Sequence, residues 1–143
     1  MTTSEIFSIA NFIAMPMWIL LLFVPKWKVT RFLIDYKIIP ILLSLVYAVY
    51  VIQYLVTEGM MDFGRLNSVM ELFTKENAVL AGWVHYLAFD LLVGMWIVNQ
   101  NKKYNIHQLL IAPCLLGTFM FGPIGFLLFM IMKSFKKTEN EIS

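Results

Sequence analysis

Charged residues are scarce in this sequence. Of its 143 residues only 14% are charged and 60% are hydrophobic, and the mean hydropathy is +0.76. A water-soluble domain of this length carries about 25% charged residues, so too few remain here to cover a soluble surface. The composition therefore excludes an ordinary soluble domain and indicates a membrane protein.

Cysteine and histidine are also rare, which limits the chemistry available. The single cysteine, Cys114, cannot form a disulfide within the chain. The two histidines, His85 and His107, lack the i,i+4 spacing of a helix-borne zinc pair. No run of Lys and Arg resembles a nucleic-acid-binding patch. We expect no metal, no other cofactor and no nucleic-acid partner.

Long apolar runs are what the sequence does contain. They occupy residues 6–24, 38–56, 78–98 and 109–132, and a helix needs about 20 apolar residues to cross a bilayer. The pattern predicts an all-α integral membrane protein, a four-transmembrane-helix bundle in a single domain over 1–143, with residues 133–143 as a tail that is disordered from residue 138. Residues 1–5 lack the basic start of a signal peptide, so we expect the first run to remain as a span.

The longest connection lies between the second and third runs. Within it, Leu66, Val69, Met70 and Phe73 recur with helical spacing. This predicts a short interfacial helix, which more often caps a bundle than forms a lid over a binding cavity.

The distribution of basic residues gives only a weak prediction of topology. The loops after the first and third runs hold six Lys and Arg together, against five in the middle connection and the tail. This favours the first and third loops in the cytoplasm and both termini outside, although the Lys-rich tail argues the other way. The composition, rich in Lys, Asn and Ile, suggests a bacterial inner membrane.

Asp90 is the residue that most needs an explanation, because it lies near the middle of the third run. A carboxylate at that depth costs about 2.5–3.5 kcal/mol, so it should face a protein interior or a cavity. At helical spacing Trp83, Tyr86, Asp90 and Gly94 form one stripe. His85 lies about 140° from Asp90, so the two share a site only if both border a broad cavity or a helical bulge intervenes. Interhelical hydrogen bonding remains an equal explanation for Asp90.

Two further features have both a packing and a functional interpretation. Asn11 precedes Pro16 in the first run and either joins two helices or lines the same cavity as Asp90. Gly122-Pro-Ile-Gly125 in the last run indicates a kink or a close helix approach, with a broken helix that exposes backbone groups as the alternative.

The third run carries a resemblance to a known family. Its pattern W-x-H-x-L-x-x-D-L-x-x-G over residues 83–94, with Asn77 before it and Gly122-Pro-Ile-Gly125 after it, resembles the plant abscisic-acid-deficiency family of neoxanthin-synthesis membrane proteins and its bacterial relatives. The resemblance implies a role in carotenoid metabolism. Plant members are needed to make neoxanthin from violaxanthin, an isomerisation that opens an epoxide.

Two functions follow as hypotheses. In the first, the protein isomerises the end group of a carotenoid or other isoprenoid: Asp90 donates a proton, His85 accepts one, Trp83 and Tyr86 stabilise developing positive charge, and Asn11 and Asn77 help to bind the substrate. In the second, it is a non-catalytic isoprenoid-binding or scaffold protein. A carotenoid or other isoprenoid lipid and the membrane are the expected partners, with a second copy of the chain or a pathway protein left open. A transporter is the less favoured function, because the sequence shows no inverted internal repeat.

Overall fold

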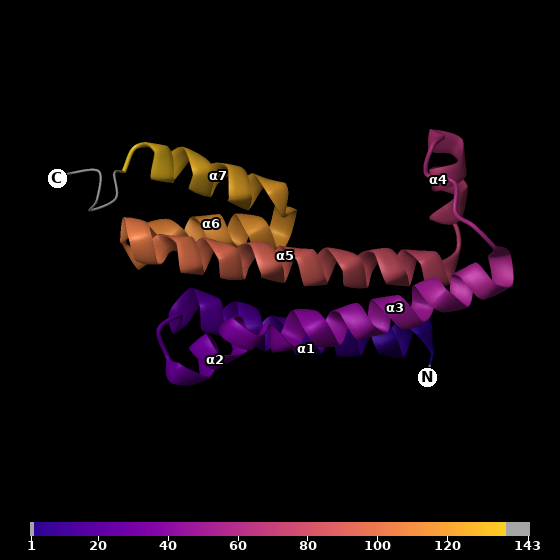
Figure 1. Cartoon of the computed structure of the whole chain (residues 1–143), viewed down its shortest axis with the longest axis horizontal. Coiled ribbons are helices and arrows are strands. Elements are labelled where there is room, and N and C mark those ends of the chain that lie inside the picture. Colours follow the sequence, from indigo (N-terminus) through magenta and orange to yellow (C-terminus); the bar gives the residue numbers. More distant parts are fainter. Residues whose placement is uncertain (1, 137–143) are drawn as a thin grey trace.

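The computed structural model describes residues 2–136, and within them the chain forms seven helices and no strand (Figure 1). The predicted disordered tail at residues 138–143 lies outside the described residues. The helices are α1 (Thr3–Phe23), α2 (Lys28–Tyr36), α3 (Ile38–Glu58), α4 (Leu66–Leu72), α5 (Glu76–Tyr104), α6 (Gln108–Phe121) and α7 (Pro123–Ser134).

Helix α5 is the element against which the others pack. It has 29 residues, which at about 1.5 Å per residue gives roughly 43 Å, longer than the apolar layer of a bilayer. In Figure 1, α1 and α3 lie along one side of α5, and α6 and α7 lie along the other. Most of the buried core comes from α5 and α1. The all-helical prediction is therefore confirmed.

Three stretches are long and apolar enough to cross a membrane: Thr3–Phe23, Lys28–Glu58 and Glu76–Tyr104. They match the first three predicted runs. The first helix begins with a capping box, in which the Thr2 hydroxyl accepts from the Glu5 amide and the Glu5 carboxylate accepts from the Thr2 amide. The N-cap of α1 is thus Thr2.

The fourth predicted run, residues 109–132, is not one helix. It breaks at Gly122, whose φ of +51° disfavours other residues, and α7 restarts with Pro123 at its first position. The two pieces have 14 and 12 residues, about 21 and 18 Å, and neither spans the roughly 30 Å apolar layer. The predicted four-span bundle is therefore not confirmed, since three helices of the described residues are long and apolar enough to span.

Instead, α6 and α7 fold back on each other as a helical hairpin (Figure 1). The end of α7 lies close to the start of α6. There the Lys136 Nζ donates a 2.9 Å hydrogen bond to the Asn105 carbonyl, two residues before His107, the N-cap of α6. Further in, the sulfur atoms of Cys114 and Met132 are 3.5 Å apart. Pro123, Gly122 and the end of α6 form the tip, which lies beside the middle of α5.

The segments between the long helices are partly helical. The basic loop after the first run contains α2, whose Thr30 and Ile34 are buried against the other helices. The predicted short helix in the middle connection is present as α4, and it stands beside the first turns of α5 (Figure 1).

Candidate functional site

A groove of about 570 Å³ lies between α3 and the first half of α5. Its walls are mainly aromatic and aliphatic, and the middle connection covers one end through Met61, Phe63, Leu72 and Phe73. This volume falls in the range of pockets that hold small molecules, about 300–1,000 Å³. The groove is mostly apolar and is lined by several of the predicted site residues, so it is the candidate site.

The tyrosine stripe of α3 forms one wall of the groove. Tyr47, Tyr50 and Tyr54 follow each other at three- and four-residue steps, which places them on one face of the helix, and all three line the groove. The stripe is visible in the sequence, where an interfacial or helix-packing face is the commoner explanation for such a pattern.

His85 lies on the opposite wall, from α5. Its ring centroid is 5.4 Å from that of Tyr47 in an edge-on arrangement and 4.7 Å from that of Phe89. The histidine is exposed rather than packed in the core, and among residues 2–136 it has no hydrogen bond to a protein group. Its ring nitrogens are therefore available to a molecule in the groove.

Trp83 and Tyr86 line the same groove and stack on each other, with ring centroids 5.6 Å apart. The Trp83 indole donates a 2.8 Å hydrogen bond to the Asn11 side chain on α1. Asn11 does not line the groove. Of its two interpretations, the structure shows the one in which it joins two helices, α1 and α5. Trp83 keeps 38% of its surface exposed, which leaves its ring accessible from the groove.

Asn77 lies where the groove opens into a polar vestibule at the first turn of α5. Lys75 stands at this rim and is joined to Glu58 at the end of α3 by an ion pair of 2.9 Å. The hydrogen bond to Glu58 raises the pKa of Lys75 above its ordinary value. The ion pair ties α3 to α5 at the open end of the groove.

Asp90 faces a different neighbour, the tip of the α6–α7 hairpin. It is 8% exposed, and a Cβ added to Gly122 would lie 2.9 Å from its Oδ1 atom. Its Oδ2 atom is buried without a hydrogen-bond partner among the described residues. One turn earlier, the Tyr86 hydroxyl donates a 3.0 Å hydrogen bond to the Met120 carbonyl at the end of α6.

The structure therefore separates the two residues predicted to share proton transfer. His85 lines the groove against α3, whereas Asp90 lies on the α6–α7 side of α5 and does not line the groove. No helical bulge intervenes, since α5 is α-helical throughout. Of the six predicted site residues, the groove brings together Asn77, Trp83, His85 and Tyr86.

Metal ligation has no support in this region. Within residues 2–136, no three side chains of His, Cys, Asp or Glu lie close enough to hold an ion. What the groove can do chemically is to enclose an apolar ring system, stabilise positive charge by aromatic faces, and exchange a proton through His85 or a tyrosine hydroxyl.

The sequence pattern of ABA DEFICIENT 4-like proteins matches residues 5–129, which contain the groove and all six predicted site residues. The chain belongs to the ABA DEFICIENT 4-like family. Protein ABA DEFICIENT 4, chloroplastic, of Arabidopsis thaliana is 22% identical over 140 residues, covering 92% of this chain and 61% of the plant protein. The chain thus spans about three fifths of the length of this curated relative.

No solved structure matches the chain. The family relation and the three long apolar helices together fit a membrane protein. The resemblance carried by residues 83–94 is confirmed at the level of the family.

Proposed function

We propose that this ABA DEFICIENT 4-like protein acts in carotenoid or isoprenoid metabolism by holding an isoprenoid end group in the aromatic groove and isomerising it by acid–base chemistry. The observation that carries the proposal is the position of His85, which is exposed inside an apolar groove between the tyrosines of α3 and the aromatic residues of α5. A substrate dissolved in the bilayer can reach such a groove without leaving the apolar phase.

The chemistry proposed follows from the groove residues. His85 transfers the proton, because histidine is the side chain most often used as a general acid or base and it is the one histidine that lines the groove. The faces of Trp83 and Tyr86 stabilise positive charge that develops on the end group. Asn77 at the mouth of the groove contacts a polar oxygen of the substrate.

Asp90, the proton donor of the sequence-based hypothesis, has a less direct place in this scheme. It stays a predicted catalytic residue, but its contact with Gly122 supports a role in holding the hairpin. A tyrosine of the α3 wall, such as Tyr47 beside His85, is better placed to return a proton within the groove.

A second candidate function is non-catalytic binding of an isoprenoid. It is favoured by the apolar character of the walls and by the open mouth of the groove, which suit retention of a lipid as well as turnover. The two functions differ in whether bound pigment changes.

The test is co-expression with pathways that supply cyclic and epoxidised carotenoids, followed by separation of the pigments and mass measurement. An isomerase gives a product of unchanged mass and altered retention, and His85→Gln lowers its yield by about 10²-fold or more, as expected for loss of a general acid–base group. His107→Gln, at the other end of the molecule, is the matched control and leaves the yield unchanged.

Pigment that co-purifies unaltered with the wild-type protein supports binding instead of turnover. Neither new pigment nor co-purified isoprenoid, across all the pathways, would contradict both functions.

A further inference from the structure

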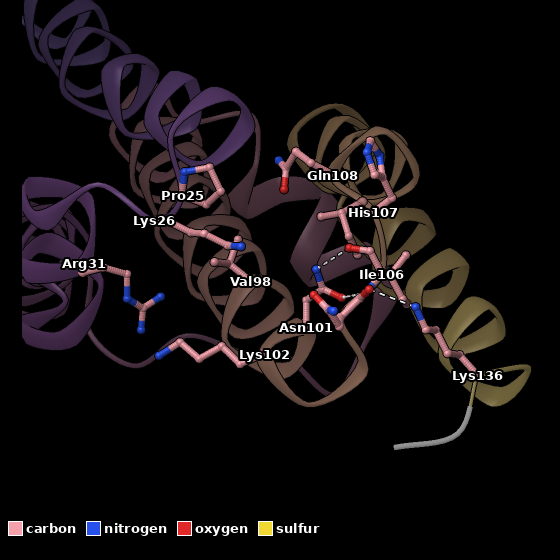
Figure 2. A pocket seen from close by; sticks show the side chains of 12 residues that line it. Pro25, Lys26, Arg31, Val98, Asn101, Lys102, Ile106, His107, Gln108 and Lys136 are labelled. Carbon is pink, nitrogen blue, oxygen red and sulfur yellow. Dashed lines mark hydrogen bonds between the residues drawn. The ribbon is translucent and has the colours of Figure 1, made fainter. Parts of the chain in front are cut away.

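A basic cup lies at the opposite end of the molecule from the aromatic groove. It has a volume of about 810 Å³ and is formed where the loop after α1, the start of α2, the end of α5 and the start of α6 meet (Figure 2). Four cationic side chains line it: Lys26, Arg31, Lys102 and Lys136. No carboxylate is among its lining residues within the described chain.

The positive charge of this cup is only partly compensated. Arg31 donates to the Asn99 side chain over 2.9 Å and lies 3.5 Å from Asp35, a carboxylate whose side chain is 61% exposed. The ammonium groups of Lys26 and Lys102 have neither an ion pair nor a hydrogen bond to any other residue of 2–136. Figure 2 shows both side chains reaching into the same cup as Arg31. Two free ammonium groups beside a guanidinium favour a bound anion.

The floor and one side of the cup are apolar. Val98, Ile106 and Ile111 lie among the cationic residues, and all three are buried in the core. A second groove of about 650 Å³ continues from the cup, shares Pro25, Lys26 and Gln108 with it, and is lined by Phe23, Val24 and Trp27. Phe23 is 74% exposed, so this groove offers an open apolar surface directly beside the cations.

We propose that the cup binds the phosphate head group of an anionic membrane lipid, with its hydrocarbon chain along Phe23 and Trp27. Inorganic phosphate would satisfy the cations alone, but the continuous apolar groove gives a lipid additional contact area. The cup lies at the C-terminal ends of α1 and α5, and basic residues at the ends of long apolar helices are typical of the level of lipid head groups. This site lies outside the proposed substrate groove and is independent of the proposed function.

The test measures binding of short-chain phosphatidylglycerol, short-chain phosphatidylcholine and inorganic phosphate to the full chain in detergent, by native mass spectrometry and calorimetry. The variant is Lys26→Gln combined with Lys102→Gln. Its matched control is Lys28→Gln with Lys103→Gln, which removes two exposed neighbouring charges that do not line the cup. Removal of the two free cations predicts about 30-fold weaker binding of phosphatidylglycerol, and the control pair predicts wild-type binding.

Three results would overturn the proposal: equal binding of phosphatidylcholine, equal weakening in the control pair, or binding of inorganic phosphate as tight as that of the lipid. The first would show that head-group charge is not recognised, the second that the effect is general surface charge, and the third that the apolar groove contributes nothing. A salt titration of the wild-type protein gives a check that needs no variant, because raised ionic strength should weaken phosphatidylglycerol binding and leave phosphatidylcholine unaffected.

Discussion

Each residue of the pattern over positions 83–94 has its own neighbour in the structure. Trp83 is bound by Asn11 on α1, His85 faces the tyrosines of α3, and Asp90 faces Gly122 of the hairpin. Gly94 lies under the Trp18 ring, which a Cβ would approach to 2.9 Å. The pattern therefore fixes how α5 contacts all of its neighbours, and only part of it belongs to the groove.

Asp90 is the residue for which packing and chemistry predict opposite results. We expect Asp90→Asn to keep thermal stability and pigment conversion, because the amide retains the size of the side chain beside Gly122. Asp90→Leu should lower the free energy of unfolding by about 1–3 kcal/mol, since the branched Leu side chain does not fit the tight space beside Gly122 at the hairpin tip. Both are measured by thermal unfolding in detergent and by pigment analysis.

The opposite outcome for Asp90 is equally clear. A loss of conversion by about 10²-fold in Asp90→Asn, at normal stability, would show that this carboxyl group takes part in proton transfer, as the proton donor predicted from the sequence. His85→Gln made alongside it shows whether the two losses are comparable.

At the scale of the element, the sequence predicts where the chain is helical but not where it reverses direction. Hydropathy finds residues 109–132 as one run because both arms of the hairpin are apolar, and averaging over a window hides the turn. The local signal was present in Gly122-Pro123, a helix stop followed by a helix start. What could not be predicted is that α6 and α7 would pack on each other, since this depends on contacts between residues on both arms.

The same limit applies to the site. The tyrosines of α3 and His85 are visible in the sequence as two separate patterns, and only the packing of α3 on α5 makes them one groove. Helical spacing correctly indicated that His85 and Asp90 point apart, because that angle is a property of α5 alone.

The hairpin depends on a close contact between its own arms, which gives a prediction for two glycines. A Cβ at Gly125 would overlap the backbone and hydroxyl of Thr118, whereas one at Gly117 would lie 3.1 Å from the Gly125 Cα. We expect Gly125→Ala to lower the free energy of unfolding by about 1–3 kcal/mol through overpacking, and Gly117→Ala to cost less. Thermal unfolding in detergent measures both, and equal tolerance of the two changes would contradict the observed contact.

At the scale of the whole molecule, the hairpin changes the distribution of charge across the membrane. With α7 returning to the start of α6, the residues 133–136 lie at the same end as the loops after α1 and α5. Of the ten Lys and Arg within residues 2–136, eight are at this end and two, Arg65 and Lys75, are at the other. Four full crossings would give nearly equal numbers of Lys and Arg on the two sides of the membrane, whereas this arrangement gives a large excess at one end. Such an excess favours this end in the cytoplasm.

This arrangement predicts termini on opposite sides of the membrane, in place of both outside. In a bacterial host, a fluorescent protein fused to the C-terminus should be fluorescent and alkaline phosphatase fused there inactive, because only the former works in the cytoplasm. A single cysteine introduced at Asn67 on α4, in a Cys114→Ala background, should react with a membrane-impermeant thiol reagent added outside intact cells. Active phosphatase at the C-terminus together with a reactive Asn67→Cys would mean that residues 108–134 cross the bilayer completely, and the hairpin would not exist in the membrane.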